Sequence, residues 1–219
     1  MRRDSWHRIG HGGASGLLPG NTLASFELAR EIGIDMVEFD VRAWRGELVL
    51  AHTVLHARRG DSVRLQDALA HLAGRRFAEI GVNIDLKHTG CEPALLHWLR
   101  SSGLLSRALI SCQVPAALER VKALEPRARV GISIGGRLAR LSRRWHHWRS
   151  TVLAGLAAGR WDALMAQHRL VDAGLVAEVR ERDRLLFAWT VNDRSLISRL
   201  RRLGVDGVAT ADPRLFVEQ

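Results

Sequence analysis

The sequence predicts an α/β protein of the (β/α)8 barrel class, and three observations support this prediction. Eight short apolar or β-branched runs alternate with stretches of helical spacing. Parallel strands that alternate with helices need the helices on their outer side, which favours closure of eight such units into a barrel. The length of 219 residues fits one domain, slightly below the usual size of this fold. We therefore expect a single domain over residues 1–219.

The predicted strands are short runs that end in turn residues or helical stretches. The first two are HRIGH at residues 7–11 and DMVEFDV at residues 35–41. The other six lie at residues 82–87, 108–112, 129–134, 162–166, 185–191 and 206–210. Between the strands, apolar residues recur at helical spacing, for example at Leu196, Ile197, Leu200 and Leu203. These intervening segments are expected to form the outer helices.

One connection is too short for a crossover helix. After Asp40 the chain reads VRAWRGELVLAH up to His52, and Arg45-Gly46 is a suitable turn. We therefore predict a β-hairpin after the second strand, folded about Gly46. Because positions 40 and 52 are symmetric about 46, Asp40 and His52 are expected to be cross-strand neighbours with their side chains on one face.

Composition indicates a folded chain with anionic partners. Hydrophobic residues make up 47% of the sequence, yet no stretch approaches the roughly 18 apolar residues of a membrane span. The N-terminus, MRRDSWHRIGHGG, lacks the apolar region of a signal peptide, so a cytoplasmic location is expected. The formal charge of +10 favours phosphorylated substrates, anionic lipid surfaces or nucleic acid. Cys91 and Cys112 are interpreted as reduced core thiols.

Three acidic residues lie at the ends of predicted strands, where a barrel places its active site. Glu38 and Asp40 are two positions apart, so on a strand they share a face. Two neighbouring carboxylates repel each other unless a proton or a cation intervenes, and oxygen ligands suit Mg²⁺ or Ca²⁺. Asp85, on the next strand, is a natural third ligand. The alternative is a set of solvated strand ends or ion pairs with arginines.

Two histidines and a lysine complete the candidate site. His11 ends the first strand, and the predicted hairpin brings His52 beside Asp40. Hydrolysis of a phosphodiester needs a base for the nucleophile and an acid for the leaving alkoxide, which two histidines supply. Lys87 shares a strand face with Asp85 and would offset phosphate charge in the transition state. Alternatively, each histidine is structural, and Lys87 forms a salt bridge to Glu38 or Asp40.

These residues belong to an ordered series of short motifs. The series comprises His11-Gly12-Gly13, Pro19-Gly20-Asn21-Thr22, Glu38-Phe39-Asp40-Val41, His52-Thr53, Asp85-Leu86-Lys87, Trp189-Thr190-Val191-Asn192 and Gly204-Val205-Asp206-Gly207. It resembles the pattern of the glycerophosphodiester phosphodiesterases. This family belongs to a superfamily of barrel phosphodiesterases that includes phosphatidylinositol phospholipase C and sphingomyelinase D. The order of the motifs is more specific than any one of them.

The resemblance implies a phosphoric diester hydrolase that cleaves glycerophosphodiesters to an alcohol and sn-glycerol 3-phosphate. It implies that one divalent cation, Mg²⁺ or Ca²⁺, is bound by Glu38, Asp40 and Asp85. By the same resemblance, His11 and His52 form the acid/base pair. Substrate or phosphate contacts are expected from Lys87, Trp189 and Asn21.

Four departures from the family pattern leave the substrate open. Gly12 replaces an arginine that contacts phosphate, Gly20 a glutamate and Thr53 an aspartate, while Asp85 replaces a longer glutamate. Because an Asp-x-Lys motif also occurs in sphingomyelinase D, a lysophospholipase D or sphingomyelinase D-like activity on lysophospholipids is the second interpretation. The third is a catalytically weakened protein that binds phosphate ligands. No nucleic-acid partner is expected, because the excess charge is spread over many segments and no recognised motif appears.

Residues 136–160 carry six arginines and no acid. We hypothesise that this segment forms a basic lid over an anionic headgroup and makes transient contact with an anionic membrane. The alternative is an ordinary basic helix whose Leu138, Leu141, Trp145 and Trp148 cover the barrel.

Overall fold

The computed structural model describes residues 6–135 and 144–217 of the chain. The strands in these residues are β1 (His7–His11), β2 (Met36–Trp44), β3 (Glu47–Leu50), β4 (Gly81–Leu86), β5 (Ala108–Cys112), β6 (Arg129–Ile134), β7 (Ala163–Gln167), β8 (Leu185–Trp189) and β9 (Gly207–Thr210). The α-helices are α1 (Leu23–Ile32), α2 (Val54–Arg58), α3 (Leu65–Leu72), α4 (Glu92–Ser101), α5 (Pro115–Leu124), α6 (Arg144–Ala157), α7 (Ala173–Glu181) and α8 (Arg194–Leu203).

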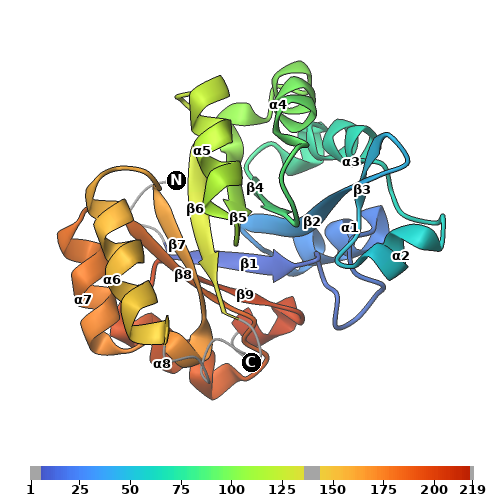
Figure 1. The fold of residues 1–219 in the computed structure, drawn as a ribbon. Coiled ribbons are helices and arrows are strands. Elements are labelled where there is room, and N and C mark those ends of the chain that lie inside the picture. The colour runs from blue at the N-terminus through green and yellow to red at the C-terminus, as the bar shows by residue number, and fades with distance from the viewer. Residues whose placement is uncertain (1–5, 136–143, 218–219) are drawn as a thin grey trace.

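The strands form a closed ring of parallel neighbours. Their order is β1-β9-β8-β7-β6-β5-β4-β2-β3, and a further pairing of β1 with β2 closes the ring. Only β3 runs antiparallel to its partner within the described sheet. The helices lie outside the ring (Figure 1). The predicted (β/α)8 barrel is therefore confirmed, and each predicted strand has a counterpart, whereas the single-domain expectation stays a prediction.

Local sequence signals explain where several helices begin and end. Thr22, Asp172 and Asp193 precede α1, α7 and α8, and each side chain accepts a hydrogen bond from the backbone N–H three residues later. Gly33 and Gly204 follow α1 and α8 with φ values of 104° and 92°. These left-handed conformations end a helix at low steric cost only when the residue has no side chain.

The hairpin after β2 is present, but its register differs by one residue from the prediction. Val41 pairs with Leu50, and the N–H of Ala51 donates to the carbonyl of Asp40 at 3.1 Å. The reason is a two-residue turn, Arg45-Gly46, with φ values of 51° and 83°. Such a turn is symmetric about a point between two residues, so Asp40 lies opposite Ala51. The predicted cross-strand pairing of Asp40 with His52 is wrong in this respect.

Two of the apolar cores in the described residues lie on the two sides of the barrel wall. The larger core lies between strands and helices and contains Phe26, Phe39 and Trp161. The smaller core fills the interior with Ile9, Met36, Leu109, Ala163, Met165, Phe187 and Ala209. Side chains two positions further along a strand point to the same face. The next inward-facing layer therefore rests on an apolar floor.

The described part of the arginine-rich segment packs as a barrel helix. Val152, Leu153 and Leu156 of α6 are buried, and Trp148 packs against them. The guanidinium of Arg149 is bound by Glu178 at 2.7 Å and by Asp172 at 3.2 Å. Residues 136–143, on which much of the lid hypothesis rests, lie outside the described residues. The membrane contact through 136–160 stays a prediction.

Two further expectations concern the cysteines and membrane-spanning helices. Cys91 and Cys112 are free and buried, and burial raises the pKa of each thiol to about 11. Their interpretation as reduced core thiols is confirmed. Among the residues that the structure describes, no helix combines the length and apolar character needed to cross a bilayer.

Candidate active site

A polar cluster lies directly above the apolar floor, at the carboxyl ends of the strands. The β1–β2 register places His11 beside Glu38, and the β2–β4 register places Asp40 beside Asp85. Lys87 follows the last residue of β4 and shares the inward face of Asp85. Neighbouring parallel strands thus bring together five residues from three distant parts of the sequence.

The three carboxylates form a compact and buried group. One oxygen each from Glu38, Asp40 and Asp85 lies within 4.8 Å of the other two. Burial raises the pKa of Glu38 well above its ordinary value, and the charges of Asp40 and Asp85 add to this rise. Burial also raises the pKa of Asp85. For Asp40, burial alone would raise the pKa, but hydrogen bonding from His52 and the charge of Lys87 lower it.

Lys87 is the cationic partner of this group. Its Nζ lies 2.6 Å from Oδ1 of Asp40 and also contacts Oδ2 of Asp85. Burial would lower its pKa, but the charges of Asp85, Asp40 and Glu38 raise it. The alternative given for Lys87, a salt bridge to Glu38 or Asp40, is thus observed with Asp40. The second carboxylate that Lys87 contacts is Asp85. When all four groups are charged, three carboxylates and one ammonium leave two negative charges, which a divalent cation neutralises. The oxygen-only donor set also fits a hard cation.

Three polar groups orient the carboxylates. The N–H of Gly12 donates to Oε2 of Glu38 at 2.9 Å, and the Ser111 hydroxyl donates to Oδ1 of Asp85 at 3.2 Å. Asn21 donates from Nδ2 to Oδ2 of Asp40 and accepts the Asp40 N–H at Oδ1, both at 2.9 Å. Asn21 was predicted to contact substrate or phosphate. That contact stays a prediction, and the two hydrogen bonds show that the Asn21 amide also holds Asp40 in place.

The two histidines lie on either side of the carboxylates in different environments. The Nε2 atom of His11 lies 3.9 Å from Oε2 of Glu38, and burial lowers the pKa of His11. The Nδ1 atom of His52 lies 3.2 Å from Oδ1 of Asp40, and this hydrogen bond raises the pKa of His52. His52 reaches Asp40 from the loop after β3, although it is not opposite Asp40 in the ladder. The two pKa values are therefore shifted in opposite directions, towards the neutral imidazole for His11 and towards the imidazolium for His52.

A cavity of about 70 Å³ opens between these groups. The sequence-predicted residues that line it are His11, Glu38, His52, Asp85, Lys87 and Trp189. Trp189 donates from Nε1 to the carbonyl of Met165 at 2.9 Å, which fixes its ring. Sequence reasoning missed Asn83, Ser111, Gln113, Ser133, Met165 and Ala209. Asn83 was detectable, because it lies two positions before Asp85 and so shares its strand face.

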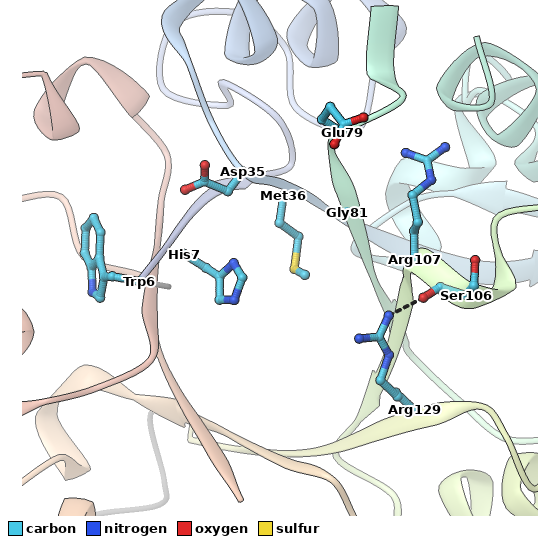
Figure 2. Close-up of a pocket in the computed structure, with 9 residues that line it drawn as sticks. All are labelled: Trp6, His7, Asp35, Met36, Glu79, Gly81, Ser106, Arg107 and Arg129. Atoms are coloured by element: carbon cyan, nitrogen blue, oxygen red, sulfur yellow. Dashed lines mark hydrogen bonds between the residues drawn. The ribbon is translucent and has the colours of Figure 1, made fainter. Parts of the chain in front are cut away.

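A larger cavity, of about 330 Å³, lies at the opposite end of the barrel (Figure 2). Its lining residues stand before or at the starts of strands, as His7, Met36 and Arg129 do. Figure 2 shows Arg129 donating to the carbonyl of Ser106. Arg107 donates to the carbonyls of Phe77 and Ile80, so both guanidinium groups bind the protein's own backbone. The smaller cavity, where carboxylates and histidines converge, is therefore the candidate active site.

Comparisons with known proteins agree with the fold and the motif order. The model of the glycerophosphoryl diester phosphodiesterase family matches residues 11–61 and 79–215. A glycerophosphodiester phosphodiesterase from Caldanaerobacter subterraneus subsp. tengcongensis is 28% identical over an aligned length of 244 positions, gaps included, and the match covers 95% of this chain and 95% of the other.

Solved structures show the same fold. A glycerophosphodiester phosphodiesterase from Agrobacterium tumefaciens superposes with a TM-score of 0.75 at 18% identity, covering 96% of this chain and 98% of the other. A phosphodiesterase from Oleispira antarctica, solved in complex with the product sn-glycerol-3-phosphate, gives a TM-score of 0.76 at 23% identity, covering 95% and 94%. The protein therefore belongs to the glycerophosphoryl diester phosphodiesterase family and is a phosphoric diester hydrolase.

Proposed function

We propose that this protein hydrolyses small glycerophosphodiesters to an alcohol and sn-glycerol 3-phosphate with the help of one divalent cation, Mg²⁺ or Ca²⁺. The observation that carries the proposal is the convergence of Glu38, Asp40 and Asp85 between two histidines. The relative from Oleispira antarctica, solved with sn-glycerol-3-phosphate, supports a small substrate of this kind. Glu38, Asp40 and Asp85 would hold the cation. When bound, the cation supplies Lewis-acid stabilisation of negative charge on the phosphoryl oxygens.

His11 and His52 are the proposed acid/base pair. Burial favours the neutral imidazole of His11, which can accept a proton from the nucleophile. The Asp40 carboxylate favours the imidazolium of His52, which can donate a proton to the leaving alkoxide. Because Nδ1 of His52 is bonded to Asp40, the Nε2 atom is left for proton transfer.

Lys87 and Trp189 are the proposed substrate contacts. Lys87 has little exposed surface, and its ammonium is held at the cavity wall by Asp40 and Asp85. There it offsets the charge that builds up on phosphate during the reaction. Gly12 has no side chain to replace the family arginine, and its N–H is already bonded to Glu38. Binding of the substrate phosphate is thus assigned to Lys87 and the cation.

The metal role is tested by product release from glycerophosphocholine in the presence of Mg²⁺, Ca²⁺ or Mn²⁺. Glu38→Gln and Asp85→Asn should each lower kcat/KM by about 100-fold or more, as expected for loss of transition-state electrostatics. Chelation should abolish activity, and cation addition should restore it. Glu79→Gln, an exposed glutamate at the opposite end of the barrel, is the matched control. Undiminished activity of Glu38→Gln would refute the proposal.

A lysophospholipid is the second candidate substrate. Val54 and Leu55 are exposed apolar residues that follow His52 closely, so they offer contacts to an acyl chain near the site. The two candidates are separated by comparing kcat/KM for glycerophosphocholine and lysophosphatidylcholine. A higher value for the lipid diester would favour the second candidate. Membership of a hydrolase family argues against the third interpretation, a weakened binding protein.

A further inference from the structure

The helix α2, which follows the active-site residue His52, presents apolar side chains to solvent. Ala57 is its inward residue, only 1% exposed, and it packs with Val49, Ala51 and Trp44 of the hairpin. Leu55 lies two positions before Ala57, about 200° around the helix, and so points away from this small core. Leu55 is 67% exposed and Val54 is 44% exposed. Neither Val54 nor Leu55 belongs to the small core that packs α2 against the hairpin.

The same surface is strongly basic. Residues 41–60 contain four arginines and a single acid, Glu47. Arg58 and Arg59 follow Val54 and Leu55 by four positions, so each arginine shares a helix face with one apolar residue. The guanidinium carbons of Arg45 and Arg58 lie 5.8 Å and 5.9 Å from the Trp44 ring, which joins the hairpin tip to α2. We name this surface the rim patch, and its members are Trp44, Arg45, Val54, Leu55, Arg58 and Arg59.

Exposed apolar residues gather at this end of the barrel. Leu18, in the connection after β1, is 37% exposed, and Val114, just after β5, is 38% exposed. Both follow the carboxyl ends of strands, where the active site lies. Leu124 and Val217 are the other large apolar residues exposed in the described part of the chain. Leu124 is the last residue of α5, towards the opposite end, whereas the carbonyl of Val217 accepts a hydrogen bond from Arg194 at the start of α8. In Figure 1, α2 stands beside the hairpin beyond the arrowhead of β1.

We propose that the rim patch docks the protein on an anionic lipid surface, with Val54 and Leu55 entering the headgroup region. An apolar face flanked by arginines suits this boundary, because the side chains enter the apolar side while the guanidinium groups bind lipid phosphates. The excess of arginines over acids favours anionic lipid as the occupant. Docking would bring the opening beside His52 to the lipid–water boundary. This inference differs from contact through 136–160, where Arg149 is already bound by acids.

The test is co-sedimentation of the full chain with vesicles, without substrate. One set contains phosphatidylglycerol with phosphatidylcholine, and the other contains phosphatidylcholine alone. We expect binding to the anionic vesicles that weakens as salt is raised. Val54→Ser/Leu55→Ser should bind at least about tenfold more weakly, because two apolar side chains no longer leave water. Arg58→Gln/Arg59→Gln should show a similar loss and a smaller salt dependence.

The control changes the same residue types at the opposite end of the barrel. Leu124→Ser/Arg127→Gln should bind the anionic vesicles as the unmodified protein does. Rim-patch variants should keep the thermal midpoint of unfolding, which separates lost docking from lost folding. Absence of binding to anionic vesicles, or an equal loss in the control, would overturn the proposal. It would also be overturned by a dimer in sedimentation velocity that Val54→Ser/Leu55→Ser converts to a monomer. Because binding is measured without turnover, failure here leaves the proposed reaction intact.

Discussion

The Nδ1 atom of His52 lies 3.2 Å from Oδ1 of Asp40, although the two residues are not paired in the hairpin ladder. The contact is possible because the N–H of Ala51, directly after β3, donates to the carbonyl of Asp40 and so holds the start of the following loop beside Asp40. The Asp40 carboxylate is therefore bound by three neighbours at once: His52, Asn21 and Lys87. Changes at each neighbour should have separable effects on chemistry, on folding and on cation binding.

His52→Gln should lower kcat for glycerophosphocholine by about 10²–10⁴-fold with little change in KM, because proton transfer is lost and binding is not. Steady-state kinetics measure both constants. His97→Gln, at an exposed position of α4, is the control and should behave as the unmodified protein does. A kcat within about twofold of the unmodified value would show that His52 does not transfer a proton in the slow step.

Asn21→Ala should destabilise the fold through two effects. It removes the partner of the Asp40 N–H and one of the hydrogen bonds to the Asp40 carboxylate, which costs about 1–3 kcal/mol. It also places alanine at a φ of 62°, a left-handed conformation that costs a residue with a side chain about 1–2 kcal/mol. Asn21→Gly removes the same hydrogen bonds without the second cost. Urea unfolding should rank the stabilities as unmodified, then glycine, then alanine. Equal stability of the two variants would refute the strain argument.

Lys87→Met should lower the thermal midpoint of unfolding of the cation-free protein. It should also increase the rise in this midpoint when divalent cations are added. Removal of one partner from a buried ion pair costs about 3–5 kcal/mol, because Asp40 and Asp85 then repel each other without compensation. Cation binding stabilises the folded state by about 2.7 kcal/mol at 100 times the dissociation constant. Thermal unfolding with chelator and with Mg²⁺ should show a larger gain for Lys87→Met than for the unmodified protein. An unchanged midpoint in chelator would contradict this role.

The ion pair of Arg8 with Asp35 should make stability dependent on pH in the acidic range. Burial would raise the pKa of Asp35, but three hydrogen bonds from Arg8 lower it overall. Ionised Asp35 therefore contributes stability above its unfolded-state pKa, and this contribution is lost as pH falls through the lower folded-state pKa. Asp35→Asn should flatten the decline of unfolding free energy between pH 5 and pH 3, measured in urea. Asp61→Asn, at an exposed position, should leave it unchanged.

The fold and most of the candidate site were predictable because both depend on strand periodicity. Glu38 and Asp40 share a face by spacing alone, and parallel pairing then places Asp85 beside Asp40. The hairpin register was not predictable to one residue, because Arg45 and Gly46 together form the turn. The role of Asn21 also depends on tertiary structure, since the loop after β1 carries it to Asp40.

The exposure of Leu55 could not be predicted from the sequence either. The run VLHAR is too short for helical periodicity to show which residue faces the core. Only the packing of Ala57 against Trp44 determines that Leu55 points outward. The lining residues Ser111 and Ser133 were missed for a related reason, because small polar residues inside apolar strands give little contrast.

The hairpin strand β3 also bears on the behaviour of the protein at high concentration. A closed barrel has no free edge, so β3 is the place in the described sheet where another chain can add a strand. Its outer side is already occupied, because the N–H of Leu50 donates to the carbonyl of Val63 at 2.8 Å and Val49 forms a bridge with Arg64. With only four residues and this covering, β3 gives little template for edge-to-edge aggregation.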